Sequence, residues 1–205
     1  MMNRFALALA AFVLAAALLV STTAAESFRR HAVPGHGISL SVPSSWVATK
    51  RALSPAVVDQ LARENPTLAP FVRGLGGPNS PMKFIALDPK VQSGFATNVN
   101  VVVVAAQSAG VTFDQYRQAL LAELRGIVQG TITQSVARIG GAQALRVSYR
   151  LRLSLGRAVT VQTLQYAVLR PGRSVVVTYA TLPSLSPSYA ATFRKSAASI
   201  RFAAS

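Results

Sequence analysis

The 205-residue sequence contains no cysteine. The protein can therefore form no disulfide bond, carry out no thiol chemistry and accept no lipid anchor on a cysteine behind a leader segment. Its stability must come from buried apolar surface, which a chain of this length is long enough to supply. The length allows one or two domains, and because no internal repeat or low-complexity linker divides the sequence, we expect one.

Acidic residues are also scarce. The chain has 6 Asp and Glu against 21 Lys and Arg, which gives a formal net charge of +15. Residues 124–205 contain no acidic side chain and 11 basic ones. Such an excess favours anionic partners and disfavours self-association. A solvated surface rich in arginine is the plainer interpretation, and the sequence leaves both open.

Patterns of catalytic residues are missing as well. The only histidines are His31 and His36, and the Gly-x-Ser-x-Gly and Ser-x-x-Lys motifs of serine enzymes are absent. The acidic residues are scattered over different predicted elements, so they form no cluster that suits a metal ion. We therefore predict no catalytic residue, no metal site, no cofactor and no enzymatic activity. A hydrolase whose site is assembled only in three dimensions is kept as an alternative.

Residues 1–25 have the layout of a secretory signal peptide. A short basic region ends at Arg4, an apolar run extends over 5–20, and small residues follow up to Ala24 and Ala25. The run of 16 residues is shorter than the roughly 20 that span a bilayer. We predict cleavage near Ala25, an extracytoplasmic location (secreted or in the cell envelope) and no transmembrane segment afterwards. An uncleaved anchor is the alternative.

The remaining chain alternates between strand and helix patterns. Residues 26–36 are expected to be an exposed N-terminal tail, and the alternation of Ile38, Leu40 and Val42 predicts a strand that ends at Pro43. The single Trp46 that follows is expected to close one end of the core. Further strands are predicted by apolar patterns separated by turn residues over 83–89, 97–106, 131–139, 142–155, 158–170 and 174–182.

Three helical regions accompany these strands. The first covers 54–75 and is interrupted at Pro66, the second covers 111–128 with a capping box of Thr112 and Gln115, and the last begins with a cap at Ser186. Short turns between strands indicate antiparallel pairing, and strands that are apolar on both faces need helices on both sides. The predicted fold is α+β, a single-domain α-β-α sandwich around a mostly antiparallel sheet of about seven strands.

Two groups of polar residues stand out. In "LRVSYRLRLSL" (145–155) strict alternation predicts a half-buried strand whose polar face carries Arg146, Arg150 and Arg152. These arginines form either a docking face for phosphate or carboxylate groups or a solvated margin of the sheet. Asn98 and Asn100 share one face of a predicted central strand. They are a candidate polar cleft for a small ligand, or they bond neighbouring loop backbone.

Four stretches resemble the PsbP-like family, whose fold is shared with the Mog-type Ran-binding proteins. They are "ISLSVPSSW" (38–46), "TNVNVVVV" (97–104), "GGAQALRVSYRL" (140–151) and "SIRF" (199–202). The resemblance assigns residues 37–203 to a PsbP-like domain and implies an α-β-α sandwich around an antiparallel sheet. The family includes extrinsic subunits of photosystem II and many exported bacterial proteins. None of the shared motifs is a catalytic signature.

These observations predict a non-catalytic exported protein with a binding or assembly role. A related alternative is a basic cell-envelope accessory factor that docks on anionic lipid or wall polymer. The expected partner is therefore a protein or an anionic envelope component. We expect no nucleic acid partner, because the chain is predicted to be exported and no aromatic residue is interleaved with the arginines on their face.

Overall fold

The computed structural model describes residues 26–49, 55–66, 69, 73, 80–106, 110–154 and 157–203. Its strands form two antiparallel sheets, one of seven strands in the order β3-β4-β5-β9-β8-β7-β6 and one of three in the order β1-β2-β10. The elements are β1 (Phe28–Val33), β2 (Ile38–Pro43), β3 (Val47–Thr49), α1 (Pro55–Glu64), β4 (Met82–Gln92), β5 (Phe95–Ala105), α3 (Phe113–Arg125), β6 (Thr133–Ile139), β7 (Ala142–Ser154), β8 (Ala158–Arg170), β9 (Arg173–Thr181), η2 (Pro183–Leu185), α4 (Ser186–Ala198) and β10 (Arg201–Phe202).

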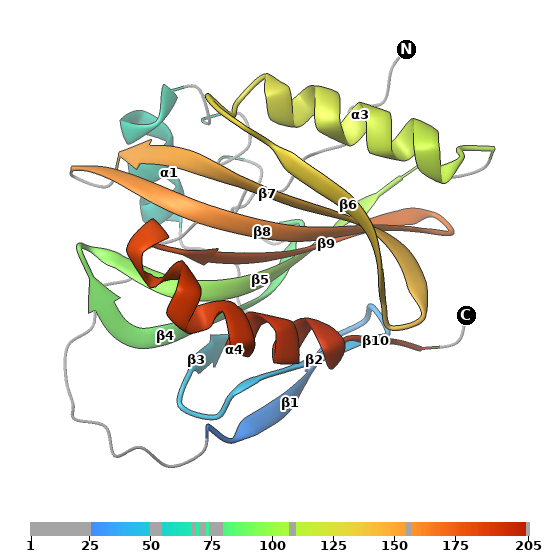
Figure 1. The fold of residues 1–205 in the computed structure, drawn as a ribbon, viewed down its shortest axis with the longest axis horizontal. Coiled ribbons are helices and arrows are strands. Elements are labelled where there is room, and N and C mark those ends of the chain that lie inside the picture. The colour runs from blue at the N-terminus through green and yellow to red at the C-terminus, as the bar shows by residue number, and fades with distance from the viewer. Residues whose placement is uncertain are drawn as a thin grey trace.

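The large sheet lies between two layers (Figure 1). Helices α1 and α3 pack on one face, and α4 packs with the small sheet on the other. Strands β5 and β9 lie at the centre of the sheet and are buried on both faces along most of their length. The chain is therefore an α+β protein of one domain around a seven-stranded antiparallel sheet, which confirms the predicted fold class.

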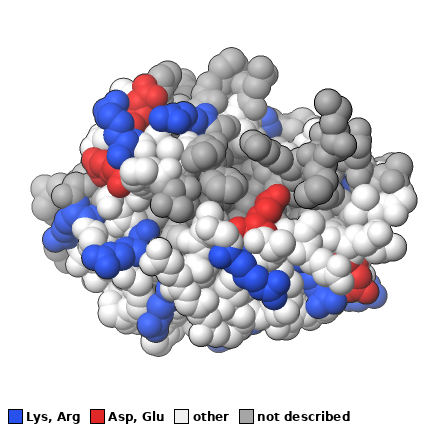
Figure 2. Space-filling model, turned by 90° about the horizontal axis from the view of Figure 1, so that it is seen from above, with Lys and Arg blue, Asp and Glu red and all other residues white. Residues whose placement is uncertain are grey.

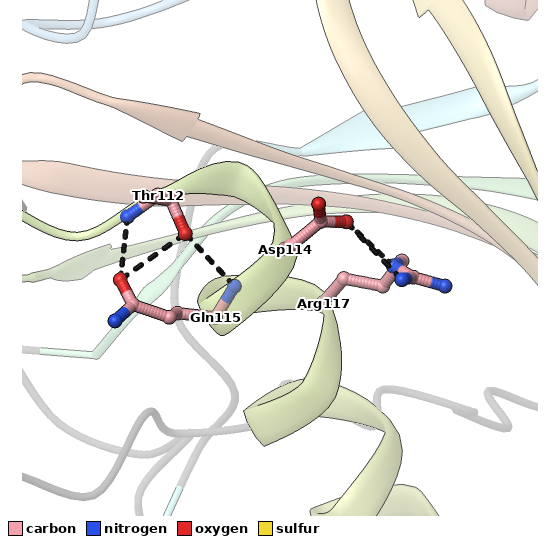
Figure 3. A network of polar contacts seen from close by, with 4 residues as sticks. All are labelled: Thr112, Asp114, Gln115 and Arg117. Atoms are coloured by element: carbon pink, nitrogen blue, oxygen red, sulfur yellow. Dashed lines mark hydrogen bonds and ion pairs between the residues drawn. The ribbon is translucent and has the colours of Figure 1, made fainter.

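The core beneath α1 and α3 is mostly aliphatic. Leu120 and Leu124 of α3 pack in the same cluster as Leu145 and Val147 of β7. Helix α3 is well specified locally, because the Thr112 Oγ1 accepts from the backbone N–H of Gln115 while the Gln115 side chain accepts from the backbone N–H of Thr112 (Figure 3). The predicted capping box is thus confirmed.

The core beneath α4 and the small sheet is richer in aromatic rings. The ring centroids of Tyr179 and Phe193 lie 5.0 Å apart, and those of Tyr189 and Phe193 lie 5.8 Å apart. Trp46 is only 6 % exposed and its ring lies 6.3 Å from that of Tyr189. The tryptophan that follows the proline turn therefore closes this core, as its position in the sequence predicts.

Residues 26–36 are not the exposed tail that we expected. Strand β1 occupies most of this segment and pairs with β2 along its whole length, and β10 pairs with the other edge of β2. Three of the six side chains of β1 are polar and only its last residue, Val33, is buried, so no alternating apolar pattern marks it as a strand. The predicted strand over 38–42 belongs to the small sheet. The three-residue β3 supplies the seventh strand of the large one.

Two predicted helix boundaries also differ. Helix α1 ends at Glu64, before the predicted break at Pro66, and most of the remaining predicted helical stretch lies outside the described residues. At the other end of the chain, Ser186 is the first residue of α4 and not its cap, because the 3-10 helix η2 leads directly into it. None of the helices in the described ranges is long and apolar enough to cross a membrane.

Candidate functional site

The three arginines predicted from alternation lie on one side of β7. Arg146, Arg150 and Arg152 are exposed, and the apolar residues between them are buried in the core under α1 and α3. Alternate residues of a strand project about 7 Å apart on the same side. Arg150 and Arg152 are therefore direct neighbours, and Arg146 lies two alternations before Arg150. We call these three residues the arginine face.

The strands on either side surround the arginine face with neutral polar groups. On β8, Gln162 lies opposite Arg150 and Thr160 lies opposite Arg152. On β6, Ser135 lies opposite Arg146. On β8, Tyr166 lies opposite Arg146. None of these neutral side chains neutralises the guanidinium charges, and all three arginines remain exposed. The positive charge of this face is therefore open to solvent.

Gln162 lies beside Arg150 and contacts it weakly. Its Nε2 donates to the Ser148 Oγ at 2.9 Å and to the Tyr149 backbone oxygen at 3.1 Å. Its Oε1 accepts from the Arg150 Nε at 3.4 Å, which is a long and weak hydrogen bond. The amide is thus fixed by β7 and turned toward the guanidinium, whose terminal nitrogens form no hydrogen bond within the described ranges.

No carboxylate pairs with the arginine face in the part of the chain that the structure describes. The one ion pair found there joins the Arg117 Nη2 to the Asp114 Oδ1 at 3.1 Å on α3, in the opposite layer (Figure 3). Acidic side chains are concentrated on that side, with Asp59 and Glu64 on α1 and Asp114 and Glu123 on α3. Seen from the side of α1 and α3, basic and acidic side chains are mixed (Figure 2).

The two other acidic residues, Asp88 and Glu26, have partners elsewhere. Asp88 on β4 is buried, and its Oδ2 accepts from the Tyr189 hydroxyl at 2.6 Å while its Oδ1 accepts from the Lys90 N–H at 2.9 Å. Burial raises the pKa of Tyr189, and the hydrogen bond to the Asp88 carboxylate raises that pKa further. Glu26 accepts from the Thr192 hydroxyl at 2.9 Å. These contacts tie α4 to β4 and to the segment just before β1.

Asn98 and Asn100 do share one face of β5, and both are fully buried. They point to the side of α1 and α3 with Thr178 of β9 and Gln165 of β8, whose Nε2 donates to the Thr178 Oγ1 at 3.1 Å. Asn98 donates from its Nδ2 to the Ala96 backbone oxygen at 3.0 Å, which agrees with the interpretation that such amides bond nearby backbone. A polar ligand site at these asparagines stays a prediction.

His31 is held more firmly than we expected. It lies in β1 and not in a tail, with its ring 5.5 Å from that of Phe84. The pKa of His36 is lowered by partial burial and then by the nearby charges of Lys83 and Arg173. In the described ranges no group of three or more His, Cys, Asp and Glu side chains is placed to hold a metal ion. The absence of catalysis stays a prediction.

Sequence reasoning missed the residues that frame the arginine face. Gln162 and Thr160 lie on alternate positions of "AVTVQTLQYAVLR", so their common side is visible in the sequence. Their position opposite the arginines depends on the register of β7 with β8, which the sequence pattern of neither strand determines by itself. That register is a result of the folded structure.

Comparison with known proteins places the fold. No protein-family model and no curated protein sequence matches the chain. Among solved structures, cyanobacterial PsbP (CyanoP) from Synechocystis matches with a TM-score of 0.54 and 13% identity, over 90% of this chain and 98% of that one. LpqN, which is involved in cell envelope biogenesis of Mycobacterium tuberculosis, matches with a TM-score of 0.52 and 13% identity, over 86% and 92%.

These similarities concern the fold and not the sequence. At 13% identity, the agreement extends over nearly the whole of both chains. It confirms the resemblance drawn from the strand and turn motifs, because the elements that carry those motifs form the same kind of sandwich. The chain therefore has the fold of the PsbP-like proteins.

Proposed function

We propose that this protein is an exported, non-catalytic binding protein that attaches to an anionic partner through the arginine face. The observation that carries the proposal is the exposure of Arg146, Arg150 and Arg152 on one strand with no carboxylate paired to them among the described residues. The chain as a whole also has more basic than acidic residues and is therefore positively charged. An anionic partner is thus also attracted at long range.

Guanidinium groups suit this role better than ammonium groups would. Arginine binds carboxylates and phosphates through two parallel N–H groups, and it is less strongly hydrated than lysine. The Gln162 amide contacts Arg150 through a long hydrogen bond and leaves its outer nitrogens accessible. Three side chains of like charge on one strand repel each other, and an anionic partner removes that repulsion.

Three further observations support the exported and non-catalytic parts of the proposal. Residues 1–25 have the layout of a signal peptide. One structure with this fold, LpqN, belongs to a protein involved in cell envelope biogenesis. The motif search and the described residues offer neither a metal cluster nor a known catalytic signature. A binding role is the function that remains best supported.

The test compares two triple variants of the purified protein. One changes Arg146, Arg150 and Arg152 to Ser, and the other changes Arg29, Arg63 and Arg125, which are exposed on β1, α1 and α3. Binding to polyglutamate and to anionic lipid vesicles is measured as a function of salt. We expect affinity to fall steeply with ionic strength, since the screening length shortens to roughly 8 Å at physiological salt.

The comparison between the two variants decides the matter. The arginine-face variant should lose about tenfold or more in affinity, because each arginine near an anionic surface contributes about 1 kcal/mol. The matched variant removes the same charge and should lose much less. Equal losses would show that the attraction comes from diffuse net charge, and the arginine face would then be a solvated margin of the sheet.

A further inference from the structure

Strand β7 is longer than the strand beside it, so part of its edge is open. β6 pairs with β7 only as far as Ser148, whereas β8 pairs with it as far as Ser154. Figure 1 shows β7 continuing beyond the start of β6. Among the strands that the structure describes, β7 therefore has a neighbour on only one side over residues 149–154. We call the uncovered side of this stretch the open edge of β7.

The backbone groups of two arginines point toward the open edge. β6 and β7 are joined by Gly140 and Gly141, whose φ values of 54° and 81° are those of a two-residue turn with both φ angles positive. In such a hairpin the residues next to the turn form a hydrogen-bonded pair, and bonded and non-bonded pairs then alternate. The even-numbered residues of β7 turn their N–H and C=O groups to the β6 side, and these include Arg150 and Arg152.

Asn65 agrees with this direction and shows that the open edge binds an amide. Its Nδ2 donates to the Ser154 backbone oxygen and its Oδ1 accepts from the Ser154 N–H, both at 2.7 Å. The side-chain amide thus takes the place that a residue of a paired strand would have. No described residue supplies an equivalent partner for the backbone of Arg150 or Arg152.

A strand placed along the open edge would have two chemically different faces. On one face its side chains would lie about 5 Å from those of Arg150 and Arg152. On the other they would lie beside Tyr149, Leu151 and Leu153, which belong to the core under α1 and α3. The first face favours carboxylates and the second favours apolar groups. The segment that fits is therefore one in which acidic and apolar residues alternate.

We propose that the open edge of β7 receives an extended segment of a partner protein in which acidic and apolar residues alternate. The segment pairs its backbone with that of Arg150 and Arg152 and places its carboxylates on their guanidinium groups. Arg146 lies beyond the open edge, opposite Ser135, and contacts the partner outside the added strand. The inference rests on the proposed function and names the partner as a protein, because backbone pairing requires a peptide.

A second copy of this chain does not fit the site. Its net charge of +15 opposes self-association, and residues 124–205 hold no acidic side chain. Each acidic residue outside that range lies on a helix, in the buried strand β4 or at Glu26. None belongs to a segment of alternating acidic and apolar residues.

The experiment uses a capped peptide of alternating Val and Glu, about eight residues long, which is enough to span the open edge. Amide hydrogen exchange of the purified protein is followed by nuclear magnetic resonance with and without the peptide. In the free protein we expect the Arg150 and Arg152 amides to exchange quickly and the Leu151 amide, which is bonded toward β8, to be protected. Saturating peptide should slow exchange at Arg150 and Arg152 by about tenfold or more.

Two variants and a second peptide separate strand pairing from charge. Arg150→Ser removes the guanidinium and keeps the backbone N–H, whereas Arg150→Pro removes both. Proline is tolerated here because the N–H of residue 150 points to the open edge, so the β7–β8 ladder stays intact. We expect the proline variant to bind the alternating peptide roughly fivefold more weakly than the serine variant, as one net hydrogen bond would imply. The second peptide, called the block peptide, has the same composition, but all its Val residues precede all its Glu residues. It cannot place all its carboxylates on one face and should bind more weakly to the unmodified protein.

The outcomes distinguish this inference from the proposed function. If the alternating peptide binds without slowing exchange at Arg150 and Arg152, or binds no better than the block peptide, strand addition is wrong and side-chain docking remains. If self-association appears and Arg150→Pro abolishes it, the occupant is a second copy and the inference is also wrong. If the arginine-face triple variant binds polyglutamate as well as the matched variant does, the proposed function itself fails. Should Arg150→Pro not fold, the exchange pattern and the two peptides decide the question alone.

Discussion

Strands β9 and β7 lie two places apart in the same sheet but are covered differently. In β9, eight of nine residues are buried, whereas β7 alternates between buried and exposed positions. Both strands are covered on the side of α1 and α3. The difference arises on the other side, where α4 and the small sheet pack over β9 and leave the arginine positions of β7 exposed. The α4 layer is thus narrower than the sheet. The arginines of β7 lie on the part that this layer leaves uncovered, where their charges stay hydrated.

The largest expected effect comes from placing a charge in the doubly covered part. Val177 of β9 is fully buried against the α4 layer. Val177→Asp should destabilise the protein by about 4–5 kcal/mol or more, because an unpaired carboxylate would lose its hydration. Urea denaturation measures this. Arg150→Asp, on the exposed side of β7, is the control and should keep the protein folded; equal destabilisation by both changes would contradict the difference between the two strands.

Trp46 closes the covered part of the sheet, so its removal should have the next largest effect. Trp46→Ala should lower the free energy of unfolding by about 3–5 kcal/mol, since it leaves a large cavity beside Tyr189. The native fluorescence should be blue-shifted, as expected for a buried indole. An unchanged denaturation midpoint in the variant, together with red-shifted native emission, would place Trp46 on the surface.

Alkaline pH should weaken the attachment of α3 to the centre of the sheet. The Tyr116 hydroxyl is buried and lies 2.5 Å from the Ser174 Oγ of β9, and burial raises its pKa from 10.0 to about 12. Because the pKa is raised in the folded protein, the stability is complete below pH 10 and is lost as the pH rises from 10 to 12, by about 2–3 kcal/mol for this group. Stability measured against pH tests this, and Tyr116→Phe should reduce the loss.

The smallest effect is expected on the uncovered side. Arg150→Ser removes an exposed side chain whose hydrogen bond to Gln162 is long. It should change the free energy of unfolding by less than about 0.5 kcal/mol, as surface changes usually do. A thermal melt of this variant beside the unmodified protein is sufficient. A clear loss of stability would mean that the arginine face has a structural role, which would weaken the case for docking.

The fold could be predicted from the sequence wherever burial sets a repeating pattern. The alternation in β7 and the continuous apolar runs of β5 and β9 reflect coverage on one or two sides, so these strands and their layers were predictable. β1 was not, because it has no alternating apolar pattern and its pairing with β2 is a tertiary contact. For the same reason the sequence did not reveal that β2 belongs to a second sheet.

The candidate site could be predicted only in part. The sequence places Arg146, Arg150 and Arg152 on one side of a strand, because side chains of a strand alternate between its two sides and all three numbers are even. It does not show Gln162 beside Arg150, which depends on the register between two strands. Nor does it show Asn65, whose contact with Ser154 joins residues 89 positions apart. Both contacts are long-range products of the fold, and no local signal specifies them.

The small sheet has a consequence for the order in which the protein folds. Its middle strand β2 is completed on one edge by β1, which comes just before it in the sequence, and on the other by β10 at residues 201–202. Further bonds join the same regions, from the Ser41 N–H to the Ser199 Oγ at 2.7 Å and from the Ala203 N–H to the Gly37 oxygen at 2.7 Å. β10 can join β2 only after everything between them has been synthesised. The α4 layer is therefore completed by contacts of very high sequence separation, which form slowly during folding.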